Sequence, residues 1–595
     1  MSNCSTADDA DALPETSDIE RTSATKDQVP SAPREMPLEI LLGLVALAFA
    51  VPLIYALFTD HIWEDSFITL RISENLLKGK GLTFNPPELV HGFTSPINVL
   101  LLAACSYVAG QTSYEATFWL YRIFCAAAFA GGMALLARRI WSATPAHPKV
   151  CVLAFALLYI FDLKMVAFTA NGMETAFMLL FFAGAMSELV RDDPAPWIAR
   201  GLFWAGMMWT RPDGCVYIAG MALADLYFSP GLRRELLVSF IKSGLLSAVI
   251  YAPWIAWATW YYGSPIPHTV IAKANVEIGP LGQVMQAFDG LFEIFVSRAN
   301  AAFLPIYDVG GYFDGKHRIF LWTLYGLSRV VSLFCCIYWI FPVNDRLGRA
   351  ASLTFVVGML YLTPMGTPVF PWYLAFAALP GLVTLTRGIV TLSDVALRLR
   401  GKNVAGELHL AAEIALVTLV GWQMVMCGIN AWEMRVQQAE IELGNRREIG
   451  LWLREHGWPQ ETVLLEPLGY IGYFSKMHML DWPGLVTPEM VAARKKVGGG
   501  MPSMIGELKP DWVLLRPAEY GRLGTLRDQF DKDYVPEHVF DARERLNQYK
   551  FIPGKPYVFV DATFFLFRRR DLRPSSFPQP VSSDRPVQPA PQEAK

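Results

Sequence analysis

The sequence contains a series of apolar stretches, each of about 18 to 24 residues. A helix of that length crosses the hydrocarbon core of a bilayer. The composition agrees, because 53% of the residues are hydrophobic and 18% are charged, whereas a soluble protein carries about a quarter charged residues. The sequence therefore predicts a polytopic α-helical membrane protein with about eleven transmembrane helices.

The spans vary in length, and 197–209 and 214–228 are short. The further apolar stretch 97–110 ends without a basic residue, so we expect a re-entrant or interfacial helix there rather than a full crossing. The expected spans are about 37–58, 117–137, 149–168, 173–190, 197–209, 214–228, 237–260, 318–342, 350–364, 371–386 and 409–430.

Basic residues cluster in alternate short turns between these spans, and the positive-inside rule assigns such turns to the cytoplasm. The N-terminus is then cytoplasmic, and the chain after about residue 430 lies outside. A full crossing at 97–110 would break this pattern from Arg138 onward. The basic residues are Arg138, Arg139, Arg191, Arg233, Arg234, Arg346, Arg349, Arg387, Arg398, Arg400 and Lys402.

Four regions follow from the composition along the chain. Residues 1–36 are polar and rich in Ser, Thr, Asp and Pro, which predicts a disordered cytoplasmic tail without a cleavable signal peptide. Residues 37–430 form the transmembrane domain, with 60–96 as its first outer loop. Residues 431–570 predict an extracytoplasmic α/β domain, and 571–595 a second disordered tail.

The α/β domain is predicted from strand-like segments that alternate with helical stretches at 435–456 and 487–508. The strand-like segments read ETVLLEPLGYIGYFS, HMLDW, DWVLLRP and YVFVDATFFLFRR.

Several familiar site motifs are missing from the sequence. The eight cysteines show neither paired nor metal-ligand spacing, and the histidines form no HExxH. No P-loop, dinucleotide-binding glycine motif or GxSxG nucleophile elbow occurs. We therefore expect no cofactor and no nucleic-acid partner, although a divalent ion between acids and a phosphate is compatible with the sequence.

The polar motifs without basic clusters fall at the outer ends of the predicted spans. Few acids lie in mid-span, which argues against an ion-coupled transporter. Convergent polar loops with aromatic walls predict an outward-facing small-molecule cavity instead. The motifs are WEDSFITLR, VHGFTSP, ANGMET, TRPDG, YYGSPIPHTVIAK and TPVFPWY.

Two adjacent acids, Glu64 and Asp65, open the first outer loop. They either cap a helix that begins at Ser66, or one of them is a general base. Two neighbouring carboxylates in a partly desolvated site do not both ionise easily, which raises the pKa of one of them. Arg71 follows about two turns later and faces either these acids or a donor phosphate.

Other polar residues at the outer ends have two interpretations each. Arg211 forms either a salt bridge with Asp213 or a clamp for phosphate. Glu174 either caps the helix 175–190 or belongs to the site.

His91, His268 and Lys273 lie in outer loops, where a histidine is more often solvated than functional. The aromatic residues Trp372, Tyr373, Tyr261 and Tyr262 form either an interfacial belt or platforms for stacking sugars.

A first outward loop that opens with two acids resembles the GT-C superfamily of integral-membrane glycosyltransferases. The longer segment EDSFITLRISENLLKGKGLTFNPPELVHGFTSP is similar to the mycobacterial-type terminal arabinofuranosyltransferases and their bacterial relatives. NGMET, TRPDG, YYGSPIPHT and GYIGYFSKMHMLDWPGLVTPEM resemble later motifs of the wider group. The matches in the first loop are Glu64, Asp65, Ile68, Arg71, Asn75, Leu76, Gly79, Gly81, Phe84, Asn85, Glu88, Val90 and Thr94.

The sequence departs from this family pattern at three positions of the loop. Glu64 stands where the family more often has Asp, which leaves open which acid is the base. His91 replaces a usual Glu, which affects the expected sugar or acceptor contacts, and Pro87 replaces a loop glycine.

The resemblance implies transfer of a sugar, D-arabinofuranose above all, from a polyprenyl-phosphate donor to a hydroxyl of a cell-envelope glycan. The reaction is expected on the outer face of the cytoplasmic membrane, where soluble nucleotide sugars are not normally available. Alternatives are mannosyl or aminoarabinosyl transfer to protein or lipid A and, in other classes, a lipid or sugar transporter, a flippase or a structural subunit.

The implied mechanism is inverting displacement with Asp65 as the preferred base and Glu64 as the alternative. Phosphate leaves readily and needs charge neutralisation more than an acid. The candidate phosphate-binding residues are Arg71, Arg211, His268 and Lys273. The candidate acceptor or sugar contacts are His91, Glu174, Trp372, Tyr373 and Asp481, with Glu466 and Tyr470 as further polar residues of the outer domain.

Overall fold

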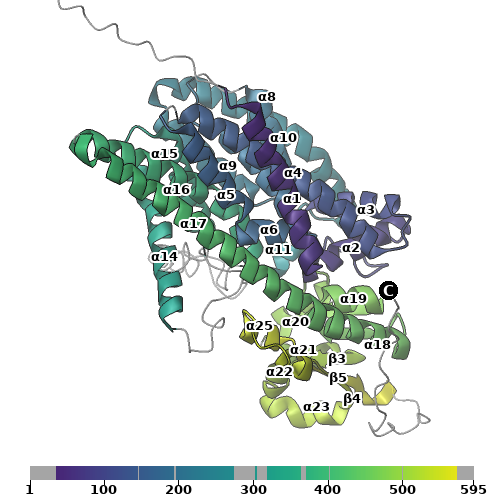
Figure 1. Cartoon of the computed structure of the whole chain (residues 1–595). Helices are drawn as coiled ribbons and strands as arrows, with labels where there is room; N and C mark the ends of the chain where they lie inside the picture. Colours follow the sequence, from purple (N-terminus) through teal and green to yellow (C-terminus); the bar gives the residue numbers. More distant parts are fainter. Residues whose placement is uncertain are drawn as a thin grey trace, which may run out of the picture. The chain divides into compact units, whose positions relative to one another are not determined.

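Long helices make up most of the fold. The computed structural model describes residues 35–144, 146–192, 196–273, 302–303, 318–362, 370–400, 402–498 and 500–572 (Figure 1). Both predicted disordered tails lie almost wholly outside these ranges. Within them, six helical segments are long and apolar enough to cross a membrane. These are α1 (Leu38–Thr59), α4 (Tyr114–Ala143), Pro230–Tyr262 with α10 (Arg233–Tyr262), Thr323–Ile340 within α14 (Arg318–Ile337) and η4 (Tyr338–Ile340), and stretches of α16 (Pro371–Arg400) and of the α17–α18 segment (Leu410–His456).

The bent pair α5 (Pro148–Ile160) and α6 (Leu163–Ala170) makes a seventh span if it is counted as one. The remaining predicted spans are also helical, but they are shorter. They are α7 (Thr175–Ser187), α8 (Trp197–Thr210), α9 (Gly214–Phe228) and α15 (Arg346–Leu362). The polytopic helical fold is confirmed, whereas the number eleven stays a prediction, because it includes these four shorter helices.

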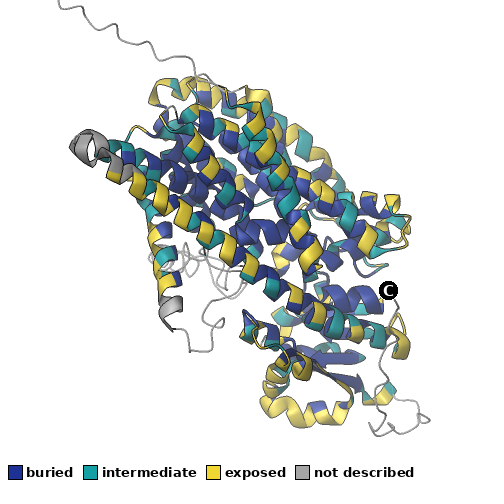
Figure 2. Cartoon of the chain, viewed as in Figure 1, coloured by how far each residue is buried: buried dark blue, intermediate teal, exposed yellow. Residues whose placement is uncertain are grey.

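The centre of the helical region is α16. In its most apolar stretch 89% of the residues are buried, whereas the corresponding share is 28% in α1 and 22% in the segment that contains α10. Figure 2 shows the same contrast, with buried residues inside and exposed residues along α1 and α17 (Lys402–Gln437). Close packing of α8 on α10 depends on Gly201, because a Cβ there would lie 3.0 Å from the Ser243 carbonyl oxygen. Small residues allow this kind of approach between membrane helices.

The first loop folds into two short helices, α2 (Glu64–Leu77) and α3 (Pro96–Val108). The helix α3 corresponds to the stretch predicted to be re-entrant or interfacial. Its 13 residues extend about 20 Å, which is less than the bilayer core. It begins at Ser95, whose hydroxyl accepts a hydrogen bond from the Asn98 backbone N–H at 3.3 Å. This N-cap fixes the start of α3, and Asn98 is a buried residue of its first turn.

The C-terminal region contains a five-stranded mixed sheet in the order β2-β1-β3-β5-β4. The strands are β1 (Thr462–Leu465), β2 (His478–Asp481), β3 (Trp512–Leu515), β4 (Tyr534–Asp541) and β5 (Thr563–Arg569). Strand β1 runs parallel to β2 and β3, whereas β5 runs antiparallel to β3 and β4.

Helices α20 (Pro488–Val497), α21 (Met501–Leu508), α22 (Pro517–Gly521), α23 (Arg527–Asp533) and α24 (Arg543–Asn547) connect or flank the strands. The α/β character agrees with the prediction, but three details differ. Residues 469–475 form helix α19 (Gly469–Ser475) rather than strand, and 555–560 form α25 (Lys555–Val560). Strand β4 was not predicted.

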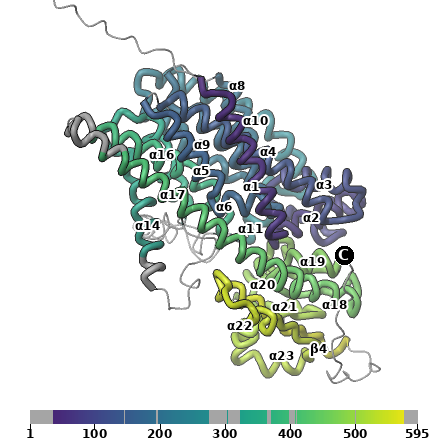
Figure 3. Tube along the Cα trace, viewed as in Figure 1, coloured from purple at the N-terminus to yellow at the C-terminus, as the bar shows by residue number. Residues whose placement is uncertain are grey.

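The C-terminal region is joined closely to the first loop. Helix α17 continues through a π-helix, η6 (Gln438–Arg447), into α18 (Glu448–His456), as the green tube in Figure 3 shows. One apolar core contains Ile68 and Phe84 of the first loop together with Val463 and Ile471 of the C-terminal region. The described parts of the first loop and of the C-terminal region accordingly belong to one compact unit.

Candidate active site

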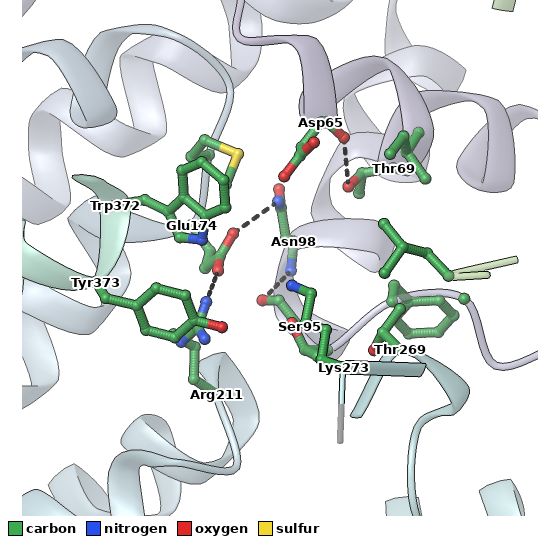
Figure 4. A pocket seen from close by; sticks show the side chains of 16 residues that line it. Asp65, Thr69, Ser95, Asn98, Glu174, Arg211, Thr269, Lys273, Trp372 and Tyr373 are labelled. Atoms are coloured by element: carbon green, nitrogen blue, oxygen red, sulfur yellow. Dashed lines mark hydrogen bonds and ion pairs between the residues drawn. The ribbon is translucent and has the colours of Figure 1, made fainter. Parts of the chain in front are cut away.

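A cavity of about 570 Å³, counting its open mouth, lies where the first loop meets α7, α8, the loop before α9, α11 (His268–Lys273) and α16 (Figure 4). Seven of the residues singled out from the sequence line its polar and aromatic wall: Asp65, Thr94, Glu174, Arg211, Lys273, Trp372 and Tyr373. The other lining residues are Ile68, Thr69, Gly92, Phe93, Ser95, Asn98, Met173, Thr269 and Leu485.

The two adjacent acids point to different neighbours. Helix α2 begins at Glu64, two residues earlier than predicted, and Trp63 occupies the N-cap position but its side chain makes no capping hydrogen bond. Both acids therefore belong to the first helical turn, where the helix dipole favours a negative charge. Asp65 lines the cavity, whereas Glu64 accepts a hydrogen bond from the Gly469 backbone N–H of α19.

Burial raises the pKa of both carboxyl groups. The pKa of Glu64 lies well above its ordinary value, because burial and then the neighbouring Asp65 disfavour its charge. Burial also raises the pKa of Asp65, but Lys273 and a hydrogen bond with Glu64 lower it. Glu64 is therefore the carboxyl that keeps a proton, and Asp65 is the one that ionises first.

Arg211 lies between two carboxylates at the end of α8. Its Nη1 donates to Glu174 at 2.7 Å and its Nε to Asp213 at 2.9 Å, and its guanidinium lies 4.4 Å from the centre of the Tyr373 ring. The expected salt bridge with Asp213 is present. Glu174 occupies the N-cap position of α7 but makes no capping hydrogen bond, so the expected cap is wrong in that respect.

Lys273 differs from Arg211 in its charge balance. Among the described residues, no carboxylate lies within 4.0 Å of its ammonium, whose nearest aromatic neighbour is the Phe370 ring at 5.5 Å. The ammonium still acts on Asp65 through space and lowers its pKa. Because Arg211 is occupied by Glu174 and Asp213, Lys273 is the cation of the described cavity wall with charge available to a ligand.

Trp372 and Tyr373 form an aromatic wall of the cavity. Their side chains are buried, so they do not belong to an interfacial belt. The Trp372 ring stacks on Phe370 with centroids 4.6 Å apart.

Tyr261 and Tyr262 do not line the cavity. Their hydroxyls bond the Leu82 backbone, where Tyr261 accepts from the N–H at 3.1 Å and Tyr262 donates to the carbonyl at 2.6 Å. They fix the first loop against α10.

Arg71 is not brought to the cavity. Its guanidinium is buried over the Phe84 ring at 4.2 Å. It donates to the carbonyl oxygens of Gly472 at 2.5 Å and Met477 at 2.8 Å. Both partners belong to the C-terminal region, so Arg71 joins α2 to it.

Neither candidate histidine lines the cavity. The His91 ring is buried and stacked on Tyr262 with centroids 4.6 Å apart, and burial lowers its pKa to about 4, so it is uncharged at neutral pH. The His268 backbone N–H donates to the His91 carbonyl at 2.9 Å. This bond places the next residue, Thr269, in the cavity wall.

The candidate residues of the C-terminal region also lie outside the cavity wall. Asp481 is buried at the end of β2, where it accepts hydrogen bonds from the backbone of Leu485 and Val486. Glu466 pairs with Arg516 at 2.5 Å. The Tyr470 ring packs on α2, and its hydroxyl donates to the Ile62 carbonyl at 3.0 Å.

Two buried polar residues of the cavity, Asn98 and Thr269, were not predicted from the sequence. The signal for Asn98 was the segment SPIN, in which a Ser N-cap and a Pro start a helix three residues ahead of the amide. Nothing in the sequence distinguished Thr269 from other loop hydroxyls. In the described part of the chain, no three His, Cys, Asp or Glu side chains gather as they would around a metal ion.

Comparison with known proteins gives a family that matches part of the chain, one curated relative and several similar solved structures. The family described as "Domain of unknown function (DUF8728)" matches residues 431–560. The terminal beta-(1->2)-arabinofuranosyltransferase of Corynebacterium glutamicum is 24% identical over 264 residues, which cover 40% of this chain. The matched part spans 37% of that relative's length.

Solved structures resemble the chain over most of its length. The oligosaccharyltransferase of Archaeoglobus fulgidus in its apo form has a TM-score of 0.50 at 12% identity, covering 84% of this chain and 73% of its own. ArnT of Cupriavidus metallidurans bound to undecaprenyl phosphate has a TM-score of 0.46 at 10% identity, covering 89% and 98%. The chain has the GT-C fold, as the resemblance of its first loop predicts.

Proposed function

We propose that this protein is an inverting glycosyltransferase that transfers a sugar from a polyprenyl-phosphate donor to a hydroxyl of a cell-envelope glycan. One observation carries the proposal. A carboxylate with a raised pKa, Asp65, and a cation without a carboxylate partner in the described structure, Lys273, line the same cavity. A base for a hydroxyl and a counter-charge for a leaving phosphate are the two groups that this reaction needs.

In the proposed reaction, Asp65 takes the proton of the acceptor hydroxyl while the hydroxyl oxygen attacks the anomeric carbon. A new carbon–oxygen bond forms as the bond between that carbon and the phosphate oxygen breaks. The polyprenyl phosphate leaves with the electron pair and becomes more negative, and the Lys273 ammonium stabilises this charge. The attack occurs opposite the leaving group, so the anomeric configuration inverts.

Glu64 is assigned a positioning role in this proposal. Its carboxyl lies between the Gly469 N–H and Asp65, and the hydrogen bond between the two acids lowers the pKa of Asp65. A protonated Glu64 thus acts as a donor that favours the ionised form of Asp65. Because Glu64 is the donor and Asp65 the ionised acceptor of this hydrogen bond, Asp65 rather than Glu64 is the proposed base.

Arg211 and Glu174 contribute to the cavity mainly through each other. Their ion pair holds the Glu174 carboxylate next to Asn98 and keeps Arg211 against Tyr373. We assign Arg211 a shaping role rather than direct binding of phosphate. Trp372 and Tyr373 supply the aromatic surface along which a sugar ring packs.

The identity of the sugar is proposed from the sequence relationship. The first loop resembles the terminal arabinofuranosyltransferases, and the curated relative from Corynebacterium glutamicum carries that activity in its name. D-arabinofuranose is therefore the proposed donor sugar. The proposed site faces away from the cytoplasm, because the basic turns at Arg138 and Arg233 lie toward the other end of α4 and α10.

The test compares Asp65→Asn with Glu64→Gln in membranes supplied with a polyprenyl-phosphate pentose and a glycan acceptor. Loss of a general base lowers the rate about 100- to 10,000-fold, so Asp65→Asn should be nearly inactive. Glu64→Gln keeps a hydrogen-bond donor beside Asp65. Its transfer rate should therefore fall only about fivefold, the equivalent of one net hydrogen bond.

Both variants replace a carboxyl by an amide of the same size, so each is the control for the other, and equal insertion is checked on immunoblots. Near-full transfer by Asp65→Asn would overturn the base assignment. The side of the membrane is tested by an impermeant thiol reagent on intact cells carrying Glu544→Cys, which should be labelled in a background lacking Cys4 and Cys215. If this cysteine is not labelled, the proposed orientation is wrong and the C-terminal region lies on the cytoplasmic side.

A further inference from the structure

Two side-chain oxygens in the cavity wall have no hydrogen-bond partner among the described residues. They are Oδ1 of Asn98 and Oγ1 of Thr269, and both atoms are buried. The residues themselves are only 2% and 6% exposed. A buried polar atom without a partner loses the hydrogen bonds that it made to water, so most such atoms in proteins are paired. Two of them on one cavity indicate that a ligand supplies the missing hydrogen bonds.

The orientation of the Asn98 amide is fixed by its neighbour. Its Nδ2 donates to Oε2 of Glu174 at 3.4 Å, while the other oxygen of Glu174 accepts from Arg211. Turning the amide over would place an acceptor oxygen against a carboxylate. The free Oδ1 therefore stays on the other side of the amide, and Figure 4 shows the Asn98 side chain between Glu174 and Asp65.

Asn98 thus presents an acceptor oxygen beside the proposed base. An amide oxygen bonds only to donors, and sugars supply donors as hydroxyl groups. When Asp65 binds the attacking hydroxyl of an acceptor, a hydroxyl on the adjacent carbon is within reach of the neighbouring amide oxygen. This arrangement suits a vicinal diol, in which one oxygen reacts and the other is held.

Thr269 lies in the part of the cavity wall that α11 forms. It precedes Lys273 by one turn of α11, so its hydroxyl lies on the side of the proposed phosphate contact. A hydroxyl both donates and accepts, and its buried position offers it no partner among the described residues. The donor sugar, which is attached to the phosphate, is the group that would meet it.

We infer that Asn98 and Thr269 form a hydroxyl-recognition subsite, in which Asn98 binds the acceptor hydroxyl next to the attacking one and Thr269 binds a hydroxyl of the donor sugar. The inference rests on the proposed glycosyl transfer and adds the acceptor class, a sugar with a vicinal diol. It also explains why the first-loop helix α3 begins where it does, since the Ser95 cap places Asn98 at this point.

The experiment measures transfer from a polyprenyl-phosphate pentose to methyl α-D-arabinofuranoside and to its 2-deoxy and 3-deoxy analogues. Wild-type protein should prefer the diol over a deoxy analogue that keeps the attacking hydroxyl by about tenfold or more in kcat/KM. In Asn98→Leu this preference should fall close to one, because the diol loses its extra bond and the deoxy analogue loses nothing. Asn98→Ala removes the same oxygen without added bulk and gives a second measurement.

Thr269→Val is isosteric and should raise the KM for the lipid-linked donor about 3- to 10-fold while leaving the diol preference intact. Thr259→Val is the control, because Thr259 is exposed and its hydroxyl donates to the Ile255 carbonyl of its own helix at 2.7 Å. An unchanged diol preference in both Asn98 variants, with transfer retained, would overturn the Asn98 assignment alone. A wild-type protein that transfers to none of the acceptors would overturn the proposed function as well.

Discussion

At the scale of single residues, the adjacent acids show how two identical functional groups acquire different roles. Both are carboxyls in the first turn of α2, and burial raises the pKa of each. Their roles differ because the two side chains point in different directions. Glu64 faces the Gly469 N–H of α19, whereas Asp65 faces the cavity and the Lys273 ammonium. A one-residue offset on a helix turns a side chain by about 100°, which is enough to place the two groups in different surroundings.

The raised pKa of Asp65 predicts the pH dependence of transfer. A base acts only when it is ionised, so the rate should rise with pH through the pKa of Asp65, at higher pH than for an ordinary aspartate. Glu64→Leu removes the hydrogen bond that lowers this pKa, and the rising limb of the profile should then move to higher pH. The measurement is kcat/KM against pH for both proteins.

Glu544→Gln is the control for this profile, because Glu544 lies at the exposed surface. It should titrate as the wild type does. A Glu64→Leu profile that moves to lower pH would contradict the assignment of Glu64 as the donor.

The acids, Arg211, Lys273 and the aromatic pair could be selected from sequence, because outer-end position and residue type already suggested binding. Arg71 shows the limit of that argument. An arginine on the same helix as the acids was as good a phosphate candidate as any, and only the fold shows that its donors are used by the Gly472 and Met477 carbonyls. Asn98 was missed because its importance arises from an unpaired oxygen, which is a property of packing.

At the scale of elements, the contact between α2 and α19 decides where the base lies. The Phe67 ring of α2 packs against Tyr470, Tyr473 and Phe474 of α19, with centroids 4.2, 4.9 and 5.6 Å away. Such aromatic pairs add about 0.5–1.5 kcal/mol each beyond their buried area. The segment GYIGYFS resembled a strand in sequence because its apolar residues are nearly continuous. It is helical because it packs between α2 and α18, and its glycines allow that approach.

Gly469 allows the closest approach in this contact. A Cβ at this position would overlap the Glu64 carbonyl oxygen, so Gly469→Ala should displace α19 and, with it, the acids. We expect transfer to fall about 10-fold or more and the melting temperature to drop, since overpacking costs about 1–3 kcal/mol. The measurements are transfer activity and thermal unfolding in detergent.

Gly506→Ala in α21 is the matched control, because nothing lies within 4 Å of a Cβ there. Alanine in an exposed helix position should be neutral or slightly stabilising. Equal activity of the Gly469 and Gly506 variants would show that the contact does not position the acids.

At the scale of the whole molecule, the apolar runs were sufficient to predict a polytopic helical protein, and the motifs of the first loop predicted the GT-C fold. The run lengths did not separate long spans from short buried helices such as α7, because both are apolar throughout. The strand β4 was missed because five of its eight residues are exposed or partly exposed, and its sequence YVPEHVFD contains a proline and two acids.

The joining of the two regions could not be predicted either. Composition changes near residue 430, which suggested separate domains, yet the first loop shares its apolar core with the C-terminal sheet. The proposed consequence is that acceptor and donor meet at a site whose base is held from both regions. Asp65 is supplied by the loop, and its neighbour Glu64 is held by α19.

In the proposed reaction, a sugar is transferred from a lipid-linked donor at the Asp65 cavity, and its anomeric configuration inverts. The most direct measurement uses purified protein in proteoliposomes, with a radiolabelled pentose offered either on polyprenyl phosphate or on a nucleoside diphosphate, and NMR of the product linkage. We expect transfer from the polyprenyl-phosphate donor only, with an inverted anomeric centre and dependence on Asp65. Transfer from the nucleotide donor, or a retained configuration, would contradict it.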